Sequence, residues 1–359
     1  MSTNTISPTN TAAENTALAN DQLRKIANRV VLEMELAIAK VAAHHAEPTA
    51  FPLPSDADSV EQILRKRFDQ LRPEQRQYAA AKVLPALQSR NGLSERRFRD
   101  LASIDLGIST PIAEQVRSLT LPDDLALAPA ALTGISEDGG FPPIPTVPTV
   151  PSGTNGGAVS SISKLEFRIQ RVKCVDETGP AWPGSDEILL GANTVDETGD
   201  VKKVPSFKVG DFDQGNTKRY TPPKRLTLFD IREGPSFPKR YFVTLVLAEE
   251  DQGGFPDFVN GLFKQVKAKV EEYVADAIAR GKPVEIAIAL AVNYIVGKIF
   301  EILTNAWNDD IFPPKTLSVR INSATHRFPG GATVSPEDVA VFKGHNGKYE
   351  VFYDWRLLP

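Results

Sequence analysis

Apolar residues near the N-terminus recur at three- and four-residue steps, which is the spacing of one buried helix face. The series predicts a long amphipathic helix that ends before Pro48, and it consists of Leu23, Ile26, Val30, Met34, Ile38 and Val41. Ser59 followed by Gln62 forms a capping box for a second helix. Pro73 and Pro111 stand where a first helical position is expected. We expect five helices before Leu121 in all, and therefore an all-helical domain over residues 17–133.

The period of the apolar positions changes to two in the C-terminal half. Leu165, Phe167 and Ile169 alternate with polar residues, and the phase slips near Arg171, as a β-bulge would cause. The Gly344-His-Asn-Gly347 sequence is typical of a hairpin turn. Further strand patterns cover residues 187–195, 201–212, 225–231, 240–248, 315–322, 338–343 and 348–357. About eight short strands separated by turn residues predict an antiparallel β-sandwich over residues 159–359.

A helical hairpin is predicted to interrupt these strands over residues 257–308. Its second helix, 284–307, is very apolar, because Asn293 is the only polar side chain between Glu285 and Lys298. A bilayer span needs about 20 apolar residues, whereas a run of about 10 to 14 is typical of a buried or interfacial helix. The pattern favours a hairpin buried against the sandwich or the N-terminal helices, and a membrane-active hairpin is the alternative.

The whole chain is therefore predicted to be an α+β multidomain protein. It combines an N-terminal helical bundle with a C-terminal antiparallel β-sandwich that carries an inserted helical hairpin. Residues 1–16 are rich in Ser, Thr, Asn and Ala and predict a disordered tail. Residues 134–158 are rich in Pro and Gly and predict an extended linker between the domains. A ligand for a proline-binding groove is the alternative for this segment.

Composition excludes several classes of function and compartment. The formal net charge of the 359 residues is -4, which does not indicate binding of nucleic acid. The N-terminus lacks the basic start and apolar core of a classical secretory signal, so the cytoplasm is the default location. Export by a specialised machine is the alternative. Cys174 is the only cysteine, so no internal disulfide and no thiolate zinc site is expected.

The common catalytic signatures are missing from the sequence. It contains no Gly-x-Ser-x-Gly elbow, no phosphate-binding loop, no dinucleotide fingerprint and no paired-histidine zinc helix. His44 and His45 close the first predicted helix, where a cation suits the helix dipole. An ordinary enzyme is therefore disfavoured, although chemistry based on carboxylates stays open.

Acidic residues gather in the loops that follow alternate strands of the predicted sandwich. If successive strands run antiparallel, these loops emerge at one end. Carboxylates that converge repel one another unless a cation lies among them, and calcium takes six to eight oxygen ligands from flexible loops. The candidate calcium ligands are Asp176, Asp186, Glu250, Asp251 and Asp257. Solvated acidic loops without a metal are the alternative.

Two segments carry a resemblance to a known family. Leu165 to Leu190, with Asp176, Gly179 and Gly184-Ser-Asp186, resembles the first acidic loop of the calcium-dependent lipid-binding sandwiches of protein kinase C and synaptotagmins. The segment from Leu245 to Phe258 resembles their third loop, where a strand ends in spaced acids. The resemblance implies a sandwich that binds calcium and a membrane. The long first loop, Glu at some ligand positions and the helical pair after the third loop depart from the family pattern.

These patterns lead to one functional hypothesis and two alternatives. The leading hypothesis is a non-enzymatic binding protein with an acidic, calcium-binding loop face, which contacts an anionic membrane surface or a protein partner. The second is a toxin or delivered effector whose apolar hairpin inserts into membranes. The third is an interaction scaffold without metal.

Overall fold

The structure confirms the α+β class, with helices in the N-terminal half and two antiparallel sheets in the C-terminal half. The predicted tail (1–16) and linker (134–158) lie outside the described residues. The computed structural model describes residues 18, 20–87, 95–125, 161–178, 186–196, 198, 201–234, 237–249, 254–278, 283–309 and 311–359.

The N-terminal half forms the predicted helices. The first is the 26-residue helix α1, and its cap residue Asn20 accepts a hydrogen bond from the amide of Leu23. Ser59 caps α2 by accepting from the amide of Gln62, but the reciprocal half of the predicted capping box is not formed, because the Gln62 side chain donates to the carbonyl of Pro54. The elements are α1 (Asp21–Ala46), α2 (Val60–Phe68), α3 (Pro73–Leu87), α4 (Glu95–Phe98) and α5 (Ile112–Arg117), with short 3-10 helices η1 (Arg99–Ser103) and η2 (Asp123–Leu125).

The C-terminal half forms a sandwich of two four-stranded antiparallel sheets. Sheet A has the strand order β4-β1-β8-β7, and sheet B has the order β3-β2-β5-β6. The bulge predicted near Arg171 is present as a register shift between Ile169 and Arg171. The strands are β1 (Lys164–Asp176), β2 (Asp186–Val195), β3 (Val201–Phe212), β4 (Thr217–Asp230), β5 (Lys239–Glu249), β6 (Lys315–Ile321), β7 (Asp338–Gly344) and β8 (Gly347–Leu358), with a short 3-10 helix η3 (Pro329–Gly331) before β7.

Strand β4 begins at Thr217, well before the predicted start at Arg225. Pro222 and Pro223 lie between these positions, and a proline cannot donate a strand hydrogen bond. Strand β4 is an edge strand of sheet A, and its pairing with β1 skips from Arg219 to Lys224. Prolines are tolerated at such a place because an edge strand needs no hydrogen bonds on its free side.

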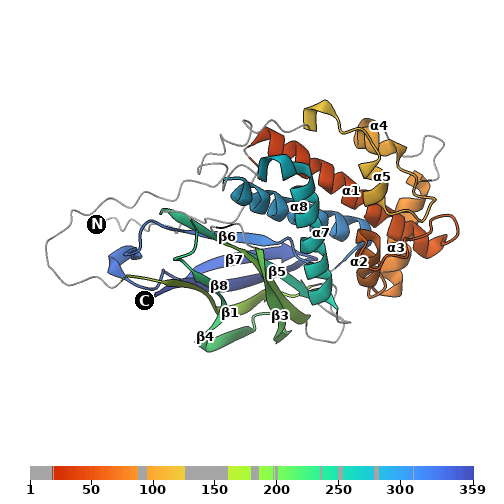
Figure 1. The fold of residues 1–359 in the computed structure, drawn as a ribbon. Coiled ribbons are helices and arrows are strands. Elements are labelled where there is room, and N and C mark those ends of the chain that lie inside the picture. Colours follow the sequence, from red (N-terminus) through yellow and green to blue (C-terminus); the bar gives the residue numbers. More distant parts are fainter. Residues whose placement is uncertain are drawn as a thin grey trace, which may run out of the picture.

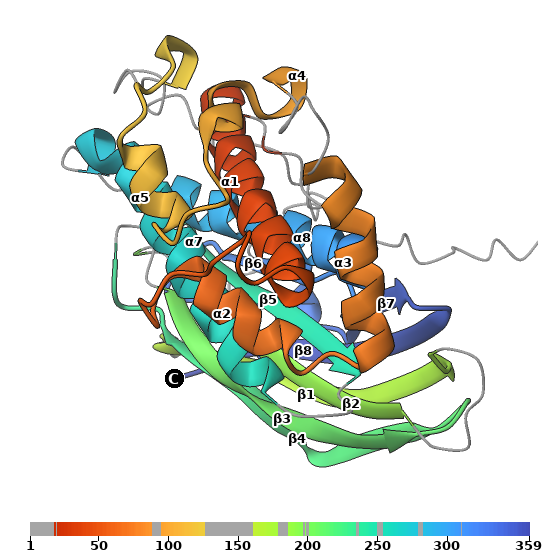
Figure 2. The same ribbon diagram turned by 90° about the vertical axis from the view of Figure 1, so that its right-hand side faces the viewer.

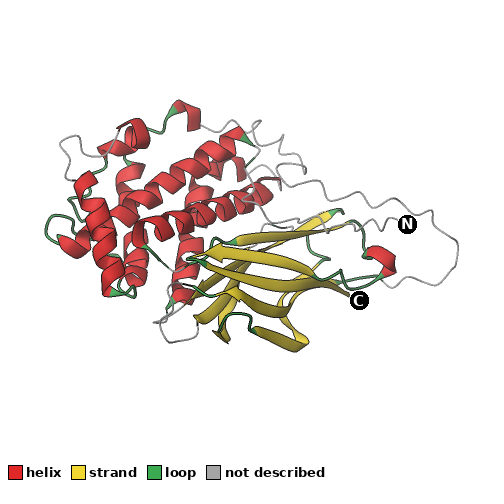
Figure 3. Ribbon diagram, turned by 180° about the vertical axis from the view of Figure 1, so that it is seen from behind, coloured by secondary structure: helices red, strands yellow, loops and turns green. Residues whose placement is uncertain are grey.

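The inserted hairpin consists of α7 (Phe255–Ile278) and α8 (Pro283–Trp307). The described α-helices gather on one side of the sandwich (Figures 1, 2 and 3). One hydrophobic core joins the N-terminal helices, the hairpin and the outward side of sheet B, where Leu189, Val246 and Ala248 contribute. A second core lies between the two sheets. The hairpin therefore shares its core with helices that lie before the predicted linker.

Helix α8 lies deep in this helical layer. Among the described helices, the stretch Ala287–Trp307 is the one long and apolar enough to span a bilayer, and 67% of it is buried inside the protein. Its single polar residue near the centre, Asn293, accepts a hydrogen bond from the Thr244 hydroxyl of β5 at 2.8 Å. Tyr294 donates to the Asn28 side chain of α1. Helix α8 thus contacts sheet B on one side and α1 on the other.

We predict that Val292→Asp strongly destabilises the protein. Val292 is 1% exposed, and a carboxylate there would have no partner in an apolar seam. The free energy of unfolding should fall by at least about 3 kcal/mol in urea titration. Ala268→Asp, on the exposed side of α7, should change it by less than about 1 kcal/mol. A Val292→Asp protein that kept its melting temperature but lost dye leakage from anionic vesicles would instead identify α8 as a membrane-active helix.

Candidate functional site

The loops that follow β1, β3 and β5 lie at the same end of the sandwich, here called the loop end. The Thr178 hydroxyl, after β1, donates a hydrogen bond to the Glu249 carboxylate at the end of β5. The amide of Gln214, after β3, donates to the Glu177 carboxylate. The β7–β8 hairpin turn is also here, because His345 is hydrogen bonded to the carbonyl of Ile311. Strand alternation predicted this convergence of loops.

Asp186 is the most buried of the predicted calcium ligands, with 5% of its surface exposed. Its Oδ2 accepts the amide of Thr178 at 2.8 Å and the phenol of Tyr349 at 2.5 Å. Burial, followed by the hydrogen bond to Asp186, raises the pKa of Tyr349 far above its ordinary value. The phenol therefore stays protonated and donates to the carboxylate. Protein donors take the place that a cation would take at this oxygen.

The other predicted ligands are spread out. Asp176 is exposed at the end of β1, opposite Lys348 of β8. Asp257 is exposed in the first turn of α7. Glu250 and Asp251 lie outside the described residues. Among the residues that the structure describes, no group of three or more His, Cys, Asp or Glu side chains could hold a metal ion. Calcium binding at the loop end stays a prediction.

A different surface stands out in the structure: the outer face of sheet A, on which no described α-helix packs (Figure 1). The strand register places every second side chain of β1, β4, β7 and β8 on this face. Its acids are Glu166, Asp176, Asp230, Glu350 and Asp354. Its cations are Lys164, Arg168, Arg171, Lys173, Arg219, Arg225, Lys343, Lys348 and Arg356. Cations outnumber acids here, although the chain as a whole has a net charge of -4.

Two acids of this face, Asp354 and Glu166, lie beneath cationic side chains. Asp354 is 3% exposed, because Arg168 binds both of its oxygens at 2.8 Å and Gln170 also donates to it. Glu166 is 7% exposed, whereas its partners Arg225 and Arg356 have side chains that are 61% and 46% exposed. Long cationic side chains cover acids and expose their own charged ends. Around Glu166, the charged groups presented to solvent are therefore the guanidinium groups of Arg225 and Arg356.

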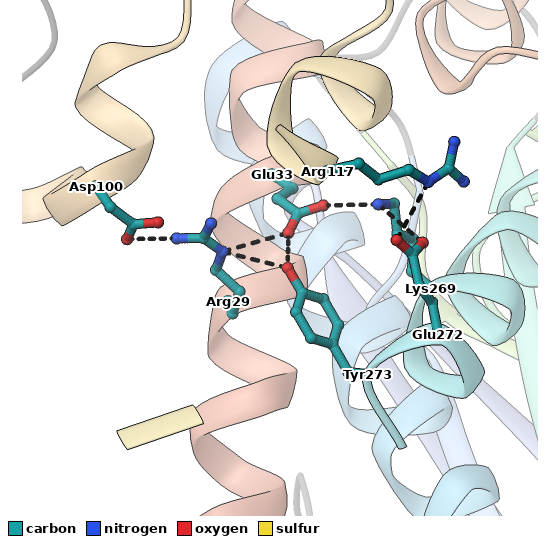
Figure 4. Close-up of polar contacts among 7 residues, drawn as sticks. All are labelled: Arg29, Glu33, Asp100, Arg117, Lys269, Glu272 and Tyr273. Carbon is teal, nitrogen blue, oxygen red and sulfur yellow. Dashed lines mark hydrogen bonds and ion pairs between the residues drawn. The ribbon is translucent and has the colours of Figure 1, made fainter. Parts of the chain in front are cut away.

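A second concentration of charge lies inside the helical layer (Figure 4). Glu33 of α1 is 2% exposed, and it binds Arg29 of the same helix at 3.3 Å and Lys269 of α7 at 3.4 Å. Tyr273 of α7 donates its phenol to Glu33 as well. Burial, and then the Glu33 carboxylate, raise the pKa of Tyr273 above its ordinary value. Arg29, Lys269 and Tyr273 therefore each form an ion pair or a hydrogen bond with Glu33.

This network extends outward to Asp100 in η1 and to Glu272 and Arg117 (Figure 4). The network contains three acids and three cations, so its charges balance, as the buried pairs at its centre require. It ties α1 to α7, to η1 and to α5 across more than half of the sequence. Its geometry suits the joining of helices rather than catalysis.

Comparison of this chain with protein-family models, with curated proteins and with solved structures gives no match. The resemblance to calcium-dependent lipid-binding sandwiches therefore stays a prediction. Sequence inspection did not identify the outer face of sheet A as a candidate surface. Its cations come from four strands, and only the pairing register brings them to one face.

We predict that Tyr349→Phe destabilises the protein by about 1.5–3 kcal/mol, the usual contribution of a hydrogen bond to a charged group. The change leaves the buried Asp186 carboxylate with one donor fewer. Tyr220→Phe is the matched control, because the Tyr220 hydroxyl is buried and has no hydrogen-bond partner among the described residues. It should be neutral or slightly stabilising. Equal effects of the two changes in urea titration would show that Asp186 gains nothing from Tyr349.

Proposed function

We propose that this chain is a non-enzymatic binding protein that docks on an anionic membrane surface through the outer face of sheet A. The observation that carries the proposal is the excess of cations on that face, where the acids Glu166 and Asp354 are buried and the side chains of Arg225 and Arg356 are exposed. Cations near an anionic leaflet each contribute about 1 kcal/mol to binding. An acidic protein needs such a local excess of positive charge to approach a negative surface.

The shape of the face supports the same proposal. Four strands supply cations over the whole width of the sheet. Leu228 of β4 and Phe352 of β8 add apolar area between them, and Arg171 stacks on the Phe352 ring at 3.6 Å. A broad sheet face that mixes cations with a few apolar side chains fits lipid headgroups better than a small ligand in a pocket.

Docking through sheet A directs the helical layer away from the membrane, because the α-helices pack on sheet B (Figures 1 and 3). This arrangement suits an adaptor that displays its helices to a protein partner. Calcium at the loop end is a separate prediction, and the proposed docking does not require it.

A second candidate function is that of an effector whose α8 enters a membrane. The length and apolar character of Ala287–Trp307 favour it. The burial of α8 and its hydrogen bond to Thr244 weigh against it, since opening the layer would expose Val, Ile and Phe side chains at about 1.5–3 kcal/mol each.

We predict that Arg219→Glu combined with Lys343→Glu weakens binding to vesicles of about one-third phosphatidylserine by more than about tenfold. Both residues are exposed on the outer face of sheet A and have no ion-pair partner among the described residues. Cosedimentation at low ionic strength measures the effect. Binding of the unaltered protein should persist with a calcium chelator and should weaken as salt is raised.

The matched control is Lys66→Glu with Lys264→Glu. These two lysines are exposed on α2 and α7 and have no ion-pair partner among the described residues. The control makes the same change in net charge but leaves sheet A intact. If both double variants lost binding equally, overall charge rather than this face would account for it. Failure of the unaltered protein to bind anionic vesicles would overturn the proposal.

A further inference from the structure

The corner between α2 and α3 contacts both places where the chain passes between the sandwich and the hairpin. The chain leaves the sandwich after Glu249 of β5 and enters α7 at Phe255. It leaves α8 at Trp307 and returns toward β6. These two crossings are neighbours, because Ile311 forms a bridge with Ala248 and the amide of Phe312 donates to the carbonyl of Leu247 at 3.0 Å.

The entry crossing is held by α2 and by the residues that follow it. The Arg67 guanidinium lies 5.7 Å from the centre of the Phe255 ring. Gln70 lies so close to Gly254 that a Cβ atom there would be 1.9 Å from its amide nitrogen. Gly254 also has a φ of 84°, so glycine is required for both space and conformation. Further along α7, Gly261 allows the same close approach to Ile63 of α2.

The exit crossing is held more tightly. Arg67 binds Asp309 through Nε at 3.1 Å and through Nη2 at 2.5 Å, and Asp309 is 0% exposed. Gln75 of α3 donates to the carbonyl of Asn308 at 2.5 Å, and Lys82 donates to the carbonyl of Asn305. Asn308 has a φ of 54°, the left-handed conformation that ends a helix. The N-terminal helices thus supply the donors that the C-terminal end of α8 needs.

Arg67 touches both crossings, and a bidentate guanidinium–carboxylate pair has a fixed geometry. We infer that the α2–α3 corner is a clamp that fixes the loop end of the sandwich from the helical layer. A displacement of the N-terminal helices then moves Phe255 and Asp309 together, and with them the ends of β5 and the Ile311–Phe312 segment. The clamp is a positioning device, and it holds whether or not sheet A binds a membrane.

Amide hydrogen exchange of the full chain tests the clamp. Arg67→Ala should speed exchange of the Phe312 amide and of the last residues of β5 by at least about tenfold. The amide of Ile231, which donates to the carbonyl of Ser163 at the opposite end of the sandwich, should exchange as before. Arg67→Lys keeps the positive charge but loses the paired N–H donors of the guanidinium group, so it should give an intermediate rate of amide exchange.

Arg65→Ala is the control, because Arg65 is exposed on the same helix and pairs with Asp69. It should leave exchange at both ends unchanged. Equal acceleration at both ends in Arg67→Ala would mean general loss of stability, and no change at Phe312 would mean that the crossings are fixed without the corner. Either result overturns the clamp. If Arg67→Ala does not fold, Gln75→Ala removes the bond to Asn308, together with the bonds that Gln75 accepts from Arg72, and makes the same test at smaller amplitude.

Discussion

The burial of α8 is the constraint on which the rest of the structure depends. Its apolar side chains surround the helix, so one covering layer is not enough. Sheet B covers one side, and α1 with α7 covers the other. Because α1 comes from the far end of the sequence, the N-terminal helices and the hairpin form one core rather than two domains that touch. This layer in turn covers the outer side of sheet B, whereas none of the described α-helices covers the outer face of sheet A.

Buried ion pairs make the packing of these helices specific. Apolar helices can slide or rotate against one another at small cost, whereas Glu33 with Arg29 and Lys269, and Arg67 with Asp309, allow one arrangement. Such pairs add little net stability, but removing one partner typically costs about 3–5 kcal/mol. The hydrogen bond from Thr244 to Asn293 fixes the position of α8 on sheet B in the same way. The helical layer therefore has a fixed position on the sandwich, which lets α2 and α3 act on the loop end.

The sequence predicted the elements better than their assembly. Period and capping predicted α1, α2, the hairpin and most strands, because these signals are local. The start of β4 was missed because Pro222 and Pro223 look like a break unless the strand is known to be an edge. Asp186 looked like a cation ligand, yet it accepts hydrogen bonds from the Thr178 amide and the Tyr349 phenol. The cationic face of sheet A was hidden because its residues come together only through the strand register.

The orientation of the protein on a membrane tests the central claim most directly. Leu228→Cys places a label on the outer face of sheet A without removing a charge, and Ala268→Cys places one on the exposed side of α7. The native Cys174 is buried and should not compete for the label. A fluorophore at position 228 should become shielded from an aqueous quencher when phosphatidylserine vesicles are added, while one at position 268 should stay accessible. Shielding at 268, or at neither position, would contradict docking through sheet A.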